Sequence, residues 1–366
     1  MYRTHISSMT ETCHENKPTK PLLSYLDLPQ HRGTVCRSAS CMLQTTTGFA
    51  VWSWLVARYT SSLSDGGLVP ALVSAMWAML VLRSYMIFHD CGHGSFFQGG
   101  GAWTRALNRV SLEVSAVMCA TPTDWNVGHA LHHSNVGRLG QDDYSWGETV
   151  FHTRSEYVRL SAWKRLAWRV IRHPVPFFAL APILTWYFKM RLPFELRPDR
   201  KAAYRCRNKM TSLAWAVCRY GLAARWSVLS IVLVGDYLAM LVGVILFHLQ
   251  HVYRTGYVRT SDEWTRKDAA LLGSSFLAVP RCLKWCTLGI EYHHIHHFRT
   301  NIPGYMLQSV HDGAPHGSWD DVVVLRRPWG VWTSLTLTVY DDVVREYATF
   351  SEVMRRHRCR EKRRVE

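Results

Sequence analysis

The sequence predicts an all-α integral membrane protein with about four transmembrane helices arranged as two hairpins. Two long apolar runs, residues 68–88 and 226–249, carry one charged residue each, Arg83 and Asp236. A helix that spans a bilayer needs about 20 such residues. The composition agrees, because 48% of the residues are hydrophobic and 19% are charged, which excludes a mainly disordered chain. A soluble protein with apolar core helices is the alternative, and it explains two such runs less well.

The first hairpin follows from the N-terminal part of the chain. Residues 1–40 are polar and lack an apolar core, so they do not look like a secretory signal. A weaker apolar segment at 46–57 precedes the first long run, and the connection at 58–67 has no Lys or Arg beyond Arg58. Because cytosolic segments carry the excess of Lys and Arg, we expect the tail in the cytosol and a hairpin that returns there near His89.

The second hairpin is less clearly marked. Residues 174–188 are apolar but short, contain three prolines and precede eight Lys and Arg residues between 189 and 209. A crossing at 174–188 would place that basic stretch outside, so we expect an interfacial or re-entrant helix there. The segment at 211–224, which contains Arg219, is then the third crossing and pairs with 226–249.

The charge balance favours an anionic partner. The chain has 43 Lys and Arg against 27 Asp and Glu, for a net charge of +16. A bilayer surface fits this balance, and no nucleic-acid-binding module is present, so we expect no nucleic acid. The cationic run at 355–364 is expected to be a disordered tail on anionic lipid. Ten cysteines without CxxC pairs indicate reduced thiols.

Three histidine clusters carry the chemistry: HDCGH at 89–93, HALHH at 129–133 and HHIHH at 293–297. Residues three and four apart share a helix face, so we expect each cluster to direct two or three imidazoles at one spot. About eight convergent imidazoles exceed the ligands of one metal and favour two. Imidazole suits Fe, Zn, Cu and Ni, and sites left open for dioxygen favour a pair of irons.

A further histidine follows the last apolar run, in FHLQH at 247–251. At the membrane depth expected for His93, His251 is the candidate ninth ligand and His248 the alternative. An interfacial histidine that binds no metal is the other interpretation.

Longer motifs resemble the membrane fatty acid desaturases, above all the acyl-lipid type that makes the Δ12 (omega-6) or a related double bond. They are HDCGHGSFF at 89–97, GHALHHSN at 128–135 and EYHHIHHFRTNIPGY at 291–305. The resemblance covers residues 40 to 310 and includes 143–153, 172–178 and 247–251. Phe298 and Gly304 depart from the family's pattern beside the site, which affects the expected position of the double bond rather than the chemistry.

The resemblance implies a four-helix membrane domain under a cytosolic helical cap that holds two iron ions, with O2 as cosubstrate. Carried over cluster by cluster, the metal ligands are His89, His93, His129, His132, His133, His293, His296 and His297, with His251 as the ninth. Residues that could orient these ligands through their second ring nitrogens are Asp90, Asp142, Asp143, Glu291 and His294. Residues that could line a substrate tunnel, or simply pack the core, are Trp125, Trp146 and Tyr292.

The implied reaction is O2-dependent insertion of a cis double bond into a fatty acyl chain, carried on a lipid or on coenzyme A. No flavin or dinucleotide fingerprint is present, so cytochrome b5 or ferredoxin is the implied electron donor, and the basic stretches suit these acidic proteins. A membrane hydroxylase or ketolase acting on a carotenoid, sterol, sphingolipid or alkane is the nearest alternative. A zinc hydrolase and a non-catalytic scaffold are more distant ones.

The expected organisation has three parts: a cytosolic tail at 1–40, a membrane and catalytic domain at 41–310, and a cytosolic C-terminal region at 311–366. The expected location is a membrane crossed several times, the endoplasmic reticulum in a eukaryote or the inner membrane in a bacterium. The active site and both termini would face the cytosol.

Overall fold

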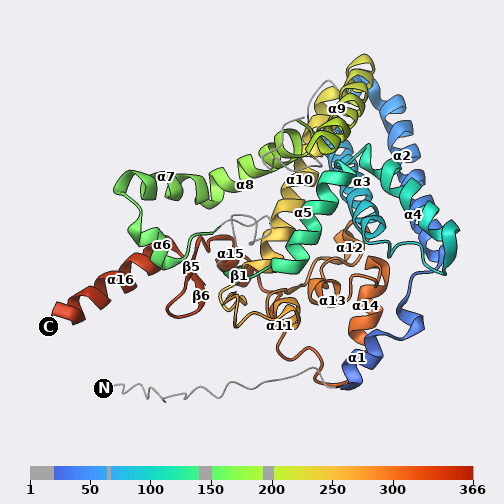
Figure 1. Cartoon of the computed structure of the whole chain (residues 1–366). Helices are drawn as coiled ribbons and strands as arrows, with labels where there is room; N and C mark the ends of the chain where they lie inside the picture. The colour runs from blue at the N-terminus through green and yellow to red at the C-terminus, as the bar shows by residue number, and fades with distance from the viewer. Residues whose placement is uncertain (1–19, 64–66, 140–150, 193–201, 366) are drawn as a thin grey trace, which may run out of the picture.

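The computed structural model describes residues 20–63, 67–139, 151–192 and 202–365, and most of them are helical (Figure 1). Four helices are long: α2 (Val35–Leu63), α3 (Leu68–Gly92), α9 (Ala202–Arg225) and α10 (Leu229–His251). The shorter helices are α1 (Lys20–Leu26), η1 (Pro29–His31), α4 (Gly101–Ala116), α5 (Pro122–Asn135), α6 (Arg154–Arg159), α7 (Ala162–Arg172), α8 (Pro174–Ile183), η2 (Leu184–Lys189), α11 (Arg266–Leu271), α12 (Arg281–Thr287), α13 (His293–Phe298), α14 (Gly304–Asp312), α15 (Pro328–Leu335) and α16 (Phe350–Val365).

Short strands pair in three places. Strand β1 (Arg138–Leu139) runs parallel to β2 (Arg259–Thr260), and β3 (Phe276–Leu277) runs parallel to β4 (Val324–Leu325). Strands β5 (Val339–Asp341) and β6 (Glu346–Ala348) form an antiparallel hairpin. These pairs fasten loops together and form no larger sheet.

The centre of the bundle is the contact between α3 and α10, with α2 and α4 against other sides of α3. The contact is close at Gly235, where a Cβ would lie 2.5 Å from the Trp77 ring and 2.8 Å from the Ser74 carbonyl oxygen. Any larger residue at this position would push the two helices apart, so glycine is required for this packing.

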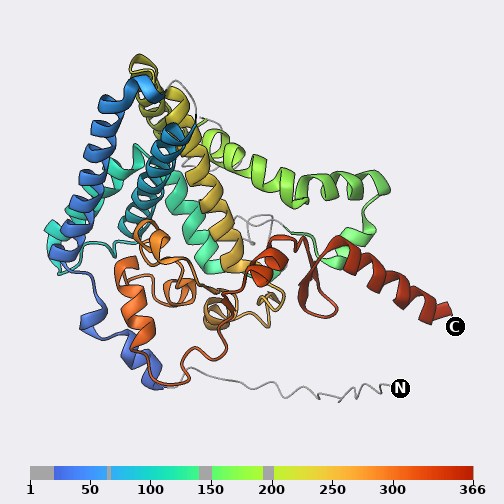
Figure 2. The ribbon, with the colours of Figure 1, turned by 180° about the vertical axis from the view of Figure 1, so that it is seen from behind.

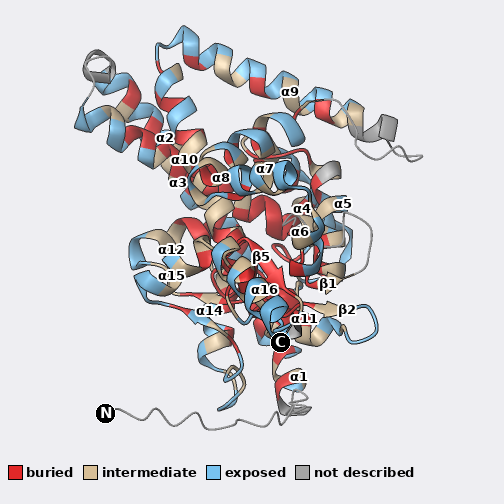
Figure 3. Ribbon diagram, turned by 90° about the vertical axis from the view of Figure 1, so that its left-hand side faces the viewer, coloured by how far each residue is buried: buried red, intermediate tan, exposed pale blue. Residues whose placement is uncertain are grey.

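In the part of the chain that the structure describes, two helices, α3 and α10, are long and apolar enough to cross a membrane, as the two apolar runs predict. By length and composition alone this is weak evidence for a membrane. The segment at 46–57 lies within α2 and the segment at 211–224 within α9, a helix that is exposed along most of its length (Figure 3). The four-span topology therefore stays a prediction.

The lone charges of the two apolar runs both bind a neighbouring helix, Arg83 through hydrogen bonds to neutral groups and Asp236 through an ion pair. Arg83 of α3 donates to Thr45 of α2 over 2.9 Å. Asp236 of α10 is completely buried, and its Oδ2 lies 2.6 Å from Nη2 of Arg219 of α9. A buried charge is costly unless it is paired, so these contacts favour α2 with α3 and α9 with α10 as packing partners.

Residues 174–188 form α8 and the π-helical turn η2 instead of one long crossing helix. Together with α7, α8 extends sideways from the bundle, as both Figure 1 and Figure 2 show. Side chains on this arm, Trp163, Leu166, Val175 and Leu180, are apolar and exposed. The expected interfacial placement of this segment suits these features.

At the other end of the bundle, α1, α11, α13 and α14 lie together (Figure 1). Apolar side chains of α1, α13 and α14 share one small core, formed around Leu26, Ile295 and Leu307. We call this region the cap. It holds the third histidine cluster against the ends of α3 and α10.

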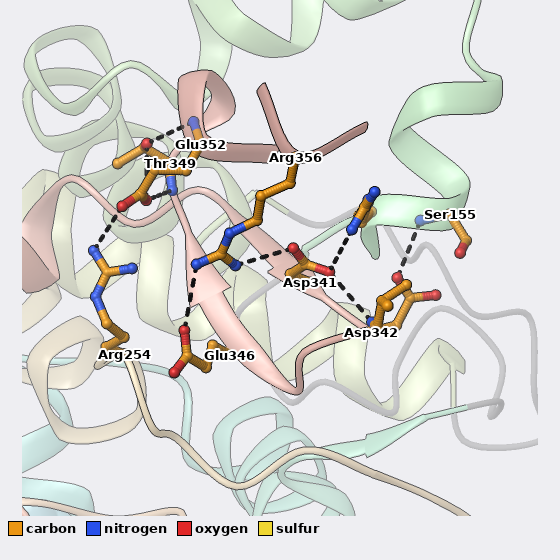
Figure 4. A network of polar contacts seen from close by, with 10 residues as sticks. Ser155, Arg254, Asp341, Asp342, Glu346, Thr349, Glu352 and Arg356 are labelled. Atoms are coloured by element: carbon orange, nitrogen blue, oxygen red, sulfur yellow. Dashed lines mark hydrogen bonds and ion pairs between the residues drawn. The ribbon is translucent and has the colours of Figure 1, made fainter. Parts of the chain in front are cut away.

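The C-terminal basic run is helical rather than the expected disordered tail, because ion pairs fix α16 to the β5–β6 hairpin (Figure 4). Arg356 lies 3.0 Å from Oδ2 of Asp341 and 3.6 Å from Glu346. Glu352 pairs with Arg254 at 3.0 Å. These contacts use one side of α16 and leave its other basic residues exposed.

Candidate metal centre

The structure gathers all nine candidate histidines into two groups. The five-histidine group consists of His89, His93, His129, His133 and His296. The four-histidine group consists of His132, His251, His293 and His297. Within each group the ligand atoms all lie within 4.8 Å of one another. The groups adjoin, because the His133 and His297 rings stack with their centroids 4.2 Å apart.

The second and third clusters each direct two imidazoles at one group, within the expected two or three, and the remaining ligand of each cluster belongs to the other group. At about 100° per residue, positions i and i+4 differ by about 40° around a helix, whereas i+3 turns about 60° the other way. The pair His129 and His133 therefore faces one group, and His132 faces the other. On α13 the division is reversed. The pair His293 and His297 belongs to the four-histidine group, and His296 belongs to the five-histidine group.

Distances between ring nitrogens fit the edges of a coordination shell. In the five-histidine group, Nε2 of His129 lies 3.0 Å from Nε2 of both His93 and His133. In the four-histidine group, His293 and His251 have Nε2 atoms 2.9 Å apart. Metal–imidazole bonds are about 2.0–2.1 Å long, so two bonds at a right angle place their nitrogens about 3.0 Å apart.

Hydrogen bonding alone does not satisfy this arrangement. Four Nε2 atoms follow one another at 3.0 Å spacings, in the order His93, His129, His133 and His296. Each neutral imidazole nitrogen either donates one hydrogen or accepts with one lone pair, so it cannot serve both neighbours fully. The conflict disappears if all four Nε2 atoms direct their lone pairs at a shared cation. The residues present therefore fit a metal.

Burial keeps these rings neutral. Desolvation lowers the pKa of His132 to about 3, and it holds the pKa of His129, His133 and His296 well below the usual range. The neighbouring imidazoles act in the same direction, because a second positive charge nearby is unfavourable. Neutral imidazole is the form that binds metals, so the site is ready for a metal at neutral pH.

Within the described residues, two of the nine rings have a partner at their second nitrogen that can orient them. Nδ1 of His89 lies 3.1 Å from Oδ1 of Asp90, and Nδ1 of His251 lies 2.9 Å from the Gly273 carbonyl oxygen. The other carboxylate oxygen of Asp90 accepts the Gly304 N–H at 2.6 Å. Asp90 thus connects the end of α3 to the start of α14 and orients a candidate ligand, as the sequence predicts.

The other predicted orienting residues lie elsewhere. Glu291 is buried and accepts a hydrogen bond from the Thr287 hydroxyl at 2.7 Å, and it belongs to neither histidine group. His294 has its Nε2 3.2 Å from Nδ1 of His311, within the cap. Asp142 and Asp143 lie outside the described residues. Cys91, inside the first cluster, belongs to neither group.

The structure separates the two candidates for the ninth position. His251 lies in the four-histidine group, whereas Nε2 of His248 contacts the Ser334 carbonyl oxygen at 3.0 Å. The three positions between them turn the two side chains by about 60° around α10, and the rings consequently reach different partners.

A mainly apolar cavity of about 220 Å³ adjoins both groups. His89, His129 and His293 line it. The apolar lining comes from α3, α5, α8, η2 and α10 and includes Met86, Trp125, Phe177, Trp186, Met240 and Phe247. This shape suits a flexible hydrocarbon chain whose carbons pass the metal groups.

Trp125 lines this cavity as predicted, but Tyr292 does not. The Tyr292 ring stacks on Phe276 with centroids 4.6 Å apart, so its role is packing in the cap. Trp146 lies outside the described residues. Gly243 is a lining residue that sequence reasoning missed, since a glycine in an apolar helix gives no sign that it faces a cavity.

Comparison with known proteins agrees with this geometry. Residues 66–322 match the family model described as "Fatty acid desaturase". A fatty acid desaturase of Bacillus subtilis (strain 168) is 30% identical over 265 residues, which cover 71% of each chain. An omega-6 fatty acid desaturase, chloroplastic, of Glycine max is 22% identical and covers 72% of this chain and 60% of its own length. An sn-1 acyl-lipid omega-3 desaturase (ferredoxin) of Synechocystis sp. is 28% identical over 32% of each chain.

Proposed function

The chain belongs to the fatty acid desaturase family, an oxidoreductase family, and we propose that it inserts a cis double bond into the acyl chain of a membrane lipid. The observation that carries the proposal is the meeting of two histidine groups at one apolar cavity. A hydrocarbon in this cavity would lie beside His89 and His129 of one group and His293 of the other.

We propose iron for both groups. The nine candidate ligands are all neutral imidazoles, with no thiolate or carboxylate among them. Such donors suit redox-active iron, and two groups of five and four suit two ions rather than one. Zinc binds imidazole equally well but supplies no electrons for a reaction with O2. His89, His93, His129, His133 and His296 would hold one iron, and His132, His251, His293 and His297 the other.

When bound, the iron pair would supply the activation of O2 that no side chain can supply. The protein's own residues position the substrate. Trp125, Trp186 and Met240 exclude water from the cavity and hold the acyl chain so that two adjacent methylenes lie beside the histidine groups. Exclusion of water also protects the reaction from side products.

The reaction balances with an external donor. A saturated two-carbon unit gives up two protons and two electrons. With two more electrons from the donor and two more protons, these reduce one O2 to two waters. Cytochrome b5 or ferredoxin is proposed as the donor, with support from a relative whose name includes ferredoxin and from the net charge of +16.

For the position of the double bond we propose Δ12 (omega-6) or a related position. The motif EYHHIHHFRTNIPGY at 291–305 and the soybean relative support it. The enzyme would be a multi-pass membrane protein with the cap in the cytosol, and the exposed apolar arm of α7 and α8 would lie at the bilayer surface.

Expression of the full chain in yeast with added stearate or oleate tests the proposal. Gas chromatography of the fatty acids should reveal a new double bond, with oleate converted to a diene. His132→Ala should abolish the new product, because His132 is completely surrounded by the four-histidine group and the protein interior. New hydroxy acids without a new alkene would contradict desaturation, and an unchanged profile from the His132→Ala variant would contradict the metal site.

A further inference from the structure

A second cavity reaches the five-histidine group through a different set of residues. It is open to solvent, has a volume of about 1010 Å³ and lies between the segment before α2, the loop after α3 and the first turns of α4. The half-buried ring of His93 forms part of its wall. We call it the α4 cavity. It shares no lining residue with the apolar cavity.

The charge of the α4 cavity is positive. Arg32, Arg105 and Arg109 line it, and no Asp or Glu is among its described lining residues. All three arginines are exposed, and none forms an ion pair with another described residue. The N-terminal end of α4 also opens here, and its helix dipole adds partial positive charge.

We propose that an acidic one-electron carrier protein docks over the α4 cavity and delivers electrons through His93. The inference rests on the proposed function, because desaturation needs two electrons from outside the chain. A carrier bound here would not compete with the substrate, since the acyl chain occupies the other cavity. Redox partners use small interfaces held mainly by charge, and an arginine-lined opening suits such an encounter.

The electron balance is simple. Two reduced carriers each lose one electron, one after the other, and leave oxidised. Together with two protons from solvent, these two electrons would complete the reduction of O2. The acyl chain supplies the remaining two electrons and two protons, and O2 leaves as two waters.

Another basic groove exists, but it lies far from the metal centre. Arg169 of α7 and Arg355, Arg358 and Lys362 of α16 line a groove of about 560 Å³. No histidine of either group lines it, and α16 and α4 lie on opposite sides of the molecule (Figures 1 and 2). Since the rate of electron transfer falls steeply with distance, the α4 cavity is the better entry point. The α16 groove is a matched control.

The test compares Arg105→Glu/Arg109→Glu with the control Arg355→Glu/Arg358→Glu, which makes the same charge change in the α16 groove. Both are measured as full-length, iron-loaded enzyme in lipid nanodiscs with reduced ferredoxin or reduced cytochrome b5. At low salt, the α4 variant should raise the KM for the carrier at least about tenfold and weaken the salt dependence of the rate. The control should change KM less than about twofold. Product formed with dithionite in place of the carrier should equal that of the wild type.

An unchanged KM in the α4 variant, or an equal rise in the control, would overturn the proposal. If the double variant loses iron, Arg32→Glu on the separate segment before α2 takes its place under the same criteria. The proposed function is tested independently, because a wild-type enzyme that forms no alkene with dithionite would contradict desaturation. Even then, the affinity of the carrier for the wild-type and variant enzymes would decide where the carrier docks.

Discussion

Asp90 is the residue whose replacement tests the orientation of the metal ligands most sharply. Its carboxylate accepts from Nδ1 of His89 at 3.1 Å and from the Gly304 N–H at 2.6 Å, and the side chain is buried. Both bonds need an acceptor, and the amide of Asp90→Asn has one carbonyl oxygen. One of the two donors must then face an NH2 group.

Either orientation of the new amide is unfavourable. If NH2 faces His89, the ring keeps its proton on Nε2, which removes the lone pair that would bind the metal. If NH2 faces Gly304, a buried N–H loses its partner at a cost of about 1–3 kcal/mol. Loss of the partner that orients a metal ligand typically costs about 10–100-fold in metal affinity, or about 1.4–2.7 kcal/mol. We therefore expect Asp90→Asn to bind iron about 10–100-fold more weakly than the wild type.

Metal analysis after equilibration with a series of chelator concentrations measures this change. The matched control is Glu291→Gln, which changes another buried carboxyl group next to the third cluster; Glu291 accepts from the Thr287 hydroxyl and belongs to neither histidine group. It should hold iron within about threefold of the wild type. Wild-type iron binding by Asp90→Asn, or an equal loss in Glu291→Gln, would refute the assigned role of Asp90.

Three further predictions concern the ligand set, pH and the cavity. His251→Ala should lower the iron content and abolish product, whereas His248→Ala, which loses a contact to Ser334, should keep its iron. In the metal-free protein the folded-state pKa of His132 is about 3 and the unfolded one about 6.5, so the unfolded chain binds more protons between these values. The free energy of unfolding therefore keeps its full value above about pH 6.5 and decreases at lower pH. His132 alone should lower it by about 2 kcal/mol at pH 5, and thermal unfolding at pH 7.5 and pH 5 measures the change. Gly243→Phe should reduce conversion of an eighteen-carbon chain at least about tenfold by filling the cavity, with Gly243→Ala close to the wild type in the fatty acid profile.

Each of these has a clear contrary result. Equal iron contents in the His251→Ala and His248→Ala variants would contradict the choice between them. A Tm of the metal-free protein that rises toward pH 5 would contradict neutral buried imidazoles. Unchanged conversion of the eighteen-carbon chain by the Gly243→Phe variant would place the acyl chain elsewhere.

Much of the site follows from the sequence because histidine spacing and apolar periodicity are local properties. The spacing of His89 and His93 predicts a shared face at the end of α3, and the structure places both in the five-histidine group. The choice of His251 over His248 depends on the position of His251 directly after an apolar run. This position is also a local property of the sequence. Family membership is confirmed, since the motifs that carry it are contiguous.

What the sequence does not predict depends on tertiary packing. Helix geometry turns His132 away from His129 and His133, but the group that each ring joins depends on α5 lying between two sets of histidines that other helices supply. Likewise, Asp90 and Glu291 look alike as acids beside histidines, and only the start of α14 at Gly304 distinguishes them. The helical C-terminus depends on a pairing of Arg356 with Asp341 that charge composition alone does not indicate.

Iron stoichiometry of the purified full-length protein, combined with X-ray absorption at the iron edge, tests the central claim most directly. Nine imidazoles in groups of five and four should hold two irons per chain, each surrounded by nitrogen neighbours at about 2.0–2.2 Å and no sulfur. One metal ion per chain, zinc after growth with ample iron, or a sulfur neighbour would contradict the account.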